Sequence, residues 1–189
     1  MGREIYSQIA GSTANNKSDY IKKGSGQAVI LECLKKVGND GEVFVARLKI
    51  LSSKPKDGSK PNEPGDVVGW PQLLTKFKAT AMGNVKSFVL NTAGVQETEV
   101  TADQFIEQFE DAINYTPGAK SEYNGRAITA VQDFRGMLVN YDTYDQQTKA
   151  QKAAKSNETN TYVKFAHVSD QGDLEARKAE LDKTNPIQG

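Results

Sequence analysis

Apolar and polar residues alternate along two neighbouring stretches in the first third of the chain. From 42 to 53, EVFVARLKILSS places four apolar residues on one face with period two: Phe44, Ala46, Leu48 and Ile50. From 27 to 37, QAVILECLKKV alternates less cleanly and leaves open which of its faces is buried. Between the two stretches, Asn39-Asp40-Gly41 tolerates positive φ. The pattern predicts two long strands joined by a tight hairpin.

A third apolar run, Val67 to Trp70, follows a loop rich in Pro, Gly and Lys. Pro71 suits the first turn of a helix because its φ is fixed, so we expect a helix over 71–80. Gly83 is expected to interrupt the helical structure, and a second short helix is expected over 84–90. The sequence therefore predicts a third strand followed by two short helices.

The second half predicts one more helix before β structure returns. Thr101 and Gln104 have the spacing of a capping box, and an apolar stripe follows to Ile113. Residues 128–144 then favour one bent strand or two short ones, with Gly136 at the bend. The polar insert 145–159 fits a mobile loop or a short exposed helix, and 161–168 fits a closing strand. A helix over 173–183 has too few apolar residues to anchor it.

These elements predict a mainly β protein with inserted helices, of the α+β class. Five or six strands with helices between the third and the fourth favour an OB-fold-like five-stranded antiparallel barrel. Residues 20–168 would form this single domain, which is an ordinary size for one core. Residues 1–19 are predicted to be a flexible arm and 169–189 a polar tail.

Composition narrows the cellular setting. The 189 residues are 37% hydrophobic, and no run approaches the roughly 20 apolar residues of a membrane span. The first residues lack the apolar stretch of a secretory signal, so we expect a cytoplasmic protein with no membrane partner. The single cysteine, Cys33, lies on an apolar strand and fits a buried reduced thiol.

The net charge is zero, but the charges are unevenly distributed. Residues 1–90 hold 14 Lys/Arg against 8 Asp/Glu, a balance of +6, and residues 91–189 have a balance of −6. Such asymmetry points only weakly to a polyanionic partner, because an ordinary dipolar surface is the simpler explanation.

The inventory of reactive residues argues against an enzyme. There is one His and one Cys, and no HExxH, GxSxG or GxGxxG pattern occurs. His167 fits a structural or surface role, and nothing fixes Asp142, Asp145 and Glu158 as a metal site rather than as solvated acids. We therefore predict no catalysis, no cofactor and no metal.

Cations and aromatic residues instead occur together on the predicted strands and the loops beside them. Single-stranded nucleic acid is bound in this way, because cations follow the backbone and bases stack on exposed rings. Each ring taken alone also fits a core position. The predicted nucleic-acid-binding residues are Lys35, Arg47, Lys49, Lys54, Lys56, Trp70, Tyr141, Tyr144, Tyr162 and Lys164.

Five segments in a fixed order carry a family resemblance. They are GSGQAVILECLKKVGNDGEVFVARLKILSS, PNEPGDVVGW, GNVKSFVLN, RGMLV and TYVKFAHV. Over roughly residues 20–168 the chain resembles bacteriophage single-stranded DNA-binding proteins related to the OB-fold. The resemblance implies sequence-nonspecific binding and protection of single-stranded DNA during phage DNA replication or recombination, in the host cytoplasm.

The same resemblance raises the question of partners. Phage or host replication proteins and a second copy of the chain are candidates. Many such proteins end in an acidic tail with an apolar tip that recruits partners, whereas this chain ends KTNPIQG, so recruitment through the tail is not expected. The alternative is a non-catalytic protein-interaction or virion-associated module on the same barrel.

Overall fold

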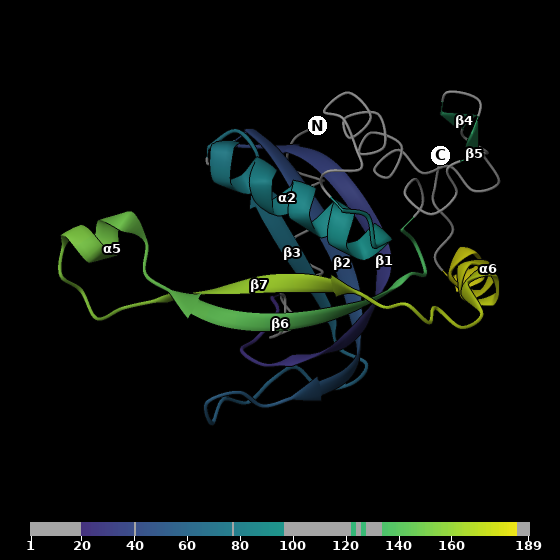
Figure 1. The fold of residues 1–189 in the computed structure, drawn as a ribbon, viewed down its shortest axis with the longest axis horizontal. Coiled ribbons are helices and arrows are strands. Elements are labelled where there is room, and N and C mark those ends of the chain that lie inside the picture. Colours follow the sequence, from purple (N-terminus) through teal and green to yellow (C-terminus); the bar gives the residue numbers. More distant parts are fainter. Residues whose placement is uncertain are drawn as a thin grey trace.

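A five-stranded antiparallel sheet dominates the computed structural model. The structure describes residues 20–39, 41–76, 78–96, 122–123, 126–127 and 134–184. The strands of the sheet are β1 (Ser25–Gly38), β2 (Gly41–Lys54), β3 (Val67–Leu73), β6 (Leu138–Gln146) and β7 (Asn160–His167). Their order across the sheet is β3-β2-β1-β6-β7 (Figure 1). The mainly β, α+β class predicted from the sequence is confirmed.

Three helices and a small second sheet complete the described elements. The helices are α2 (Lys78–Ala93), α5 (Lys149–Ala153) and α6 (Leu174–Thr184), and the small sheet pairs β4 (Glu122–Tyr123) with β5 (Arg126–Ala127). Several predicted features lie outside the described residues: the arm 1–19, the helix from Thr101 to Ile113, and the first part of the bent strand, 128–133.

The predicted hairpin is confirmed, and a bulge explains the irregular pattern of its first strand. Gly38 pairs with Gly41, which has a φ of 97°. In β1, Ile30 pairs with Leu48 but Glu32 pairs with Arg47, so Leu31 is an extra residue. The bulge shifts the alternation of inward-facing and outward-facing residues by one position. Ala28, Ile30 and Cys33 therefore all face the core.

The prediction of a helix over 71–80 is wrong from Pro71 to Lys76, and only the residues from Lys78 onward are helical, as the start of α2. Pro71 instead continues β3, where it pairs with Val45 and is exposed. A proline is tolerated there because β3 lies at the edge of the sheet, where a missing N–H need not cost a ladder hydrogen bond. The predicted interruption at Gly83 is also wrong, since α2 passes through this residue as one helix of 16 residues.

Gly83 offers a simple test of this continuous helix. It is exposed, and a Cβ placed on it would meet nothing within 4 Å. Because alanine favours a helix interior over glycine by about 0.8–1.0 kcal/mol, we expect Gly83→Ala to raise the free energy of unfolding by about that amount. Urea denaturation followed by circular dichroism measures the change. A destabilised variant would contradict the helical placement.

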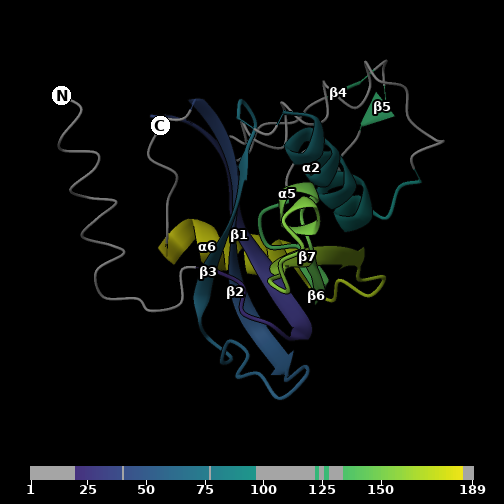
Figure 2. The same ribbon diagram turned by 90° about the vertical axis from the view of Figure 1, so that its left-hand side faces the viewer.

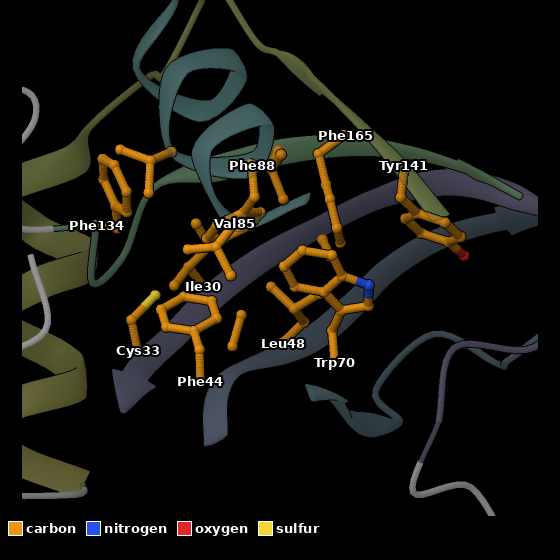
Figure 3. Packing of buried hydrophobic residues seen from close by; sticks show 14 of the residues in the cluster. Ile30, Cys33, Phe44, Leu48, Trp70, Val85, Phe88, Phe134, Tyr141 and Phe165 are labelled. Carbon is orange, nitrogen blue, oxygen red and sulfur yellow. The ribbon is translucent and has the colours of Figure 1, made fainter. Parts of the chain in front are cut away.

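The core lies between α2 and the inner face of the sheet (Figure 3). Phe88 from α2 is at its centre, with ring centroids 5.9 Å from Phe44, 5.3 Å from Trp70 and 4.9 Å from Phe165. Trp70 and Phe165 belong to the two edge strands, and their centroids are only 5.0 Å apart. The sheet therefore curves until side chains from its opposite edges meet beneath α2.

The sheet curves without closing in the part of the chain that is described. No ladder of hydrogen bonds joins β3 to β7 there. Instead α2 contacts both of these edge strands. The predicted barrel is thus present only as a strongly curved open sheet.

A hairpin arm projects from the body of the protein. β6 and β7 extend together beyond the core and carry α5 at their far end (Figures 1 and 2). The closing strand predicted over 161–168 is β7, and the predicted polar insert holds the short exposed helix α5. A capping box between Thr148 and Gln151 begins this helix, which explains how so short a polar segment becomes helical.

The C-terminal helix α6 is anchored by polar contacts, contrary to the expectation that too few apolar residues would leave it free. Arg135 is buried, and its Nη2 donates to the carbonyl oxygen of Leu181 at 2.7 Å. Its Nη1 lies 3.2 Å from Oδ1 of Asp182. Leu174 at the start of the helix packs against the core. The anchor is a buried arginine 46 residues away from its carbonyl acceptor, which the local apolar pattern does not reveal.

No described helix is long and apolar enough to cross a membrane.

Candidate nucleic-acid interface

Two tyrosines and a lysine form a cluster on the outer face of β6 and β7. Tyr144 and Tyr162 are directly opposite each other across the two strands, with ring centroids 5.7 Å apart and planes inclined by 28°. Nζ of Lys164 lies 4.7 Å from the centroid of the Tyr144 ring, within the range of a cation–π interaction. Both rings are half-buried and Lys164 is exposed. The cluster thus combines two stacked rings with a positive charge over one of them.

Strand alternation explains why this cluster faces outward. In β6, Tyr141 and Thr143 are buried, so Asp142 and Tyr144 must face the other side. In β7, Phe165 is buried, which places Tyr162 and Lys164 outside.

Trp70 and Tyr141 do not belong to this surface. Their exposed fractions are 8% and 3%, and both belong to the core cluster. The prediction that they stack bases is therefore wrong. Each is a large apolar ring at a strand position that faces the core, where α2 or the curved sheet covers it. The Tyr141 hydroxyl has no hydrogen-bond partner, and burial raises the pKa of this phenol.

The predicted cations of β2 lie on its outer face. Arg47 and Lys49 are both exposed, as is Lys54 at the end of the strand. Nη1 of Arg47 lies 2.6 Å from Oε1 of Glu32, its cross-strand partner in β1. This pair neutralises Arg47 in the free protein. Exposed ion pairs of this kind contribute only about 0–1 kcal/mol, so a phosphate can compete for the arginine.

A second group of charges connects the loop after β2 to the base of the arm. Nζ of Lys56 lies 2.9 Å from Oδ1 of Asp142 and also donates to the carbonyl oxygen of Thr143. Nζ of Lys23 lies 2.5 Å from Oδ2 of Asp145 and 3.0 Å from Asp57. Lys56, predicted to bind phosphate, is thus already paired with a carboxylate of the protein.

These contacts shift the ionisation of both partners in the Lys23–Asp145 pair. The hydrogen bond from Lys23, followed by that from Thr161, lowers the pKa of Asp145 below its ordinary value. The hydrogen bonds to Asp145 and Asp57 raise the pKa of Lys23. Both groups are therefore charged at neutral pH, and the pair fixes the arm to the segment before β1.

The last predicted residue, Lys35, pairs with Phe44 in the β1–β2 ladder, and its side chain lies outside the described residues.

Among the described residues, no group of three or more His, Cys, Asp or Glu side chains could hold a metal ion. Nδ1 of His167 lies 3.0 Å from the carbonyl oxygen of Thr92, which connects β7 to α2.

The arm carries cations that the sequence analysis did not select. Three lysines lie on or just after α5, and all are exposed: Lys149, Lys152 and Lys155. Their spacing of three residues within a polar segment was a visible signal. It gained meaning only when the segment proved to be the tip of an arm that continues from the tyrosine cluster (Figure 1).

Comparison with protein-family models and with curated proteins finds no match.

Proposed function

We propose that this protein binds single-stranded DNA without sequence preference and without catalysis, on an OB-like barrel. The strand order supports the fold assignment. β1 lies between β2 and β6, and α2 is inserted between the third and the fourth strand of the five-stranded sheet. Small Greek-key barrels of this kind bind oligonucleotides on the face of strands 2 and 3 and on the adjoining loops.

The observation that carries the proposal is the cluster of Tyr144, Tyr162 and Lys164. A nucleic-acid base can stack on the accessible part of these half-buried tyrosine rings, which is worth about 1–3 kcal/mol per base. The adjacent ammonium group of Lys164 can neutralise the phosphate of the same nucleotide. Duplex DNA cannot use this arrangement, because its bases are already stacked and paired.

The exposed lysines extend the cluster in both directions. Lys149, Lys152 and Lys155 lie towards the tip of the arm, and Lys49 and Lys54 lie on β2. A backbone that follows these cations makes contacts that do not depend on the base. Sequence preference should therefore be weak and the affinity strongly dependent on salt.

In this proposal the protein coats and protects single-stranded DNA during replication or recombination, the role implied by its resemblance to phage proteins. One observation favours a second candidate, a non-catalytic protein-interaction or virion-associated module. Arg47 and Lys56 are paired with Glu32 and Asp142, so part of the surface has mixed charge and is less suited to a polyanion than a purely basic surface.

Titration of a labelled oligo-dT, followed by fluorescence anisotropy at about 50 and about 200 mM salt, separates the two candidates. Contact with about four phosphates gives a slope of roughly −3 in log K against log salt, so affinity should fall about 50-fold over this range. Duplex DNA of equal length should fail to compete. No binding at micromolar protein, or binding that does not respond to salt, would refute the proposal and favour the interaction module.

A further inference from the structure

Tyr20 presents a large exposed ring at the edge of the sheet. Its exposed fraction is 66%, whereas the next residue, Ile21, packs against the core. The backbone of Tyr20 forms an isolated parallel bridge with Gly69 of β3. Because the other edge of β3 pairs with β2, Tyr20 occupies the edge that a closed barrel would join to β7.

The bridge places Tyr20 in a row with a cation on the outer face. Gly69 lies between the buried residues Val68 and Trp70, so it faces outward, and its partner in β2 is Arg47. Neighbouring strands are about 4.8 Å apart, so the Cα atoms of Arg47 and Tyr20 are separated by roughly 10 Å. Only a glycine, without a side chain, lies between them.

The conformation of Gly69 does not require a glycine. Gly69 does not have a positive φ, and it pairs with Arg47 of β2 as an ordinary residue of β3. A glycine inside a strand often marks the close approach of a ligand or of another backbone. At Gly69 the approaching backbone is that of Tyr20.

The segment that carries Tyr20 is held in place before any ligand binds. The backbone N–H of Lys22 donates to Oδ1 of Asn62 at 2.8 Å, and Asn62 is 1% exposed. The carbonyl oxygen of Asn62 in turn accepts a hydrogen bond from Ser53 at the end of β2. Because this backbone is already anchored, stacking on the ring does not carry the additional entropy cost of ordering the segment.

We propose that Tyr20 and Arg47 flank a second base-stacking position above Gly69. This inference rests on the proposed single-stranded DNA function and extends it to the edge of β3, apart from the tyrosines of the arm. The Tyr20 ring receives the base, while Arg47, released from Glu32, and the exposed Lys49 receive the adjoining phosphates. The inference requires Tyr20 to act through its ring and not through its backbone bridge.

The test compares Tyr20→Ala, Tyr20→Phe and a control, Val37→Ala, in the full-length protein. Val37 is an 80% exposed apolar residue near the tip of the β1–β2 hairpin and is remote from this row. Each protein is titrated with oligo-dT and with an abasic oligonucleotide of the same length. Tyr20→Ala should weaken oligo-dT binding about tenfold, while Tyr20→Phe and Val37→Ala stay within about twofold of the wild type. On the abasic strand, which has no base to stack, Tyr20→Ala and wild type should bind equally.

Each result has a distinct meaning. If the wild type binds oligo-dT and Tyr20→Ala binds equally well, the second stacking position is refuted while the proposed function stands. Equal losses of affinity for both oligonucleotides would also refute stacking, because the substitution would then have weakened binding without involving a base. If the wild type itself binds neither oligonucleotide, the proposed function fails and this inference fails with it. An unchanged urea midpoint for Tyr20→Ala verifies that its fold is intact.

Discussion

Replacing Tyr144 and Tyr162 together by alanine is expected to weaken oligo-dT binding by about 10- to 100-fold. The two rings stack on each other at 5.7 Å and are accompanied by Lys164, so they form one platform and should be removed as a unit. A loss of one stacked base corresponds to about 1–3 kcal/mol, and each 1.4 kcal/mol is a factor of ten. Fluorescence anisotropy at constant salt measures the effect.

The matched control replaces both tyrosines by phenylalanine, which keeps the rings and removes only the hydroxyl groups. This variant should retain affinity within about twofold. The salt slope of the alanine variant should equal that of the wild type, because no cation has been removed. Wild-type affinity in the double alanine variant would show that the cluster is not the DNA-binding surface.

Replacing Phe88 by alanine is expected to lower the free energy of unfolding by about 3–5 kcal/mol. This ring is 1% exposed and contacts rings from β2, β3 and β7, so its loss leaves a cavity where α2 meets the curved sheet. For a protein of this size the midpoint of thermal unfolding should fall by roughly 6–20 °C. Urea denaturation and calorimetry measure the two quantities.

Met82 provides the comparison within the same helix, since its side chain is 42% exposed. Met82→Ala should change the free energy of unfolding by less than about 0.5 kcal/mol. A loss below about 1 kcal/mol for Phe88→Ala would mean that α2 is not the cover of the core.

The sequence predicted more binding residues than a single surface of the protein contains. It selected rings and cations by type, and strand parity then separated them. Tyr141 and Tyr144 are three residues apart, so strict alternation already places them on opposite faces. Which of those faces is inside depends on α2 and on the opposite edge of the sheet. The structure buries Tyr141 fully and leaves Tyr144 half-buried on the outer face.

Ion pairing is a second feature that residue types could not reveal. Lys56 and Asp142 are 86 positions apart, and Lys23 and Asp145 are 122 apart. Such pairs form because the β1–β6 ladder brings the base of the arm to the segment before β1. They decide which lysines are already paired and which, such as Lys49 and Lys54, are simply exposed.

Local sequence patterns predicted some of the elements correctly. Period-two alternation specified β2, a glycine-flanked turn specified the hairpin, and the polar insert favoured a loop or a short exposed helix, because each depends on neighbouring residues. Tertiary structure decided the rest. It extended β3 through Pro71, inserted the bulge at Leu31, anchored α6 on Arg135 and sorted the aromatic residues between core and surface. Those outcomes depend on contacts between residues far apart in the chain, whose free energy no local pattern contains.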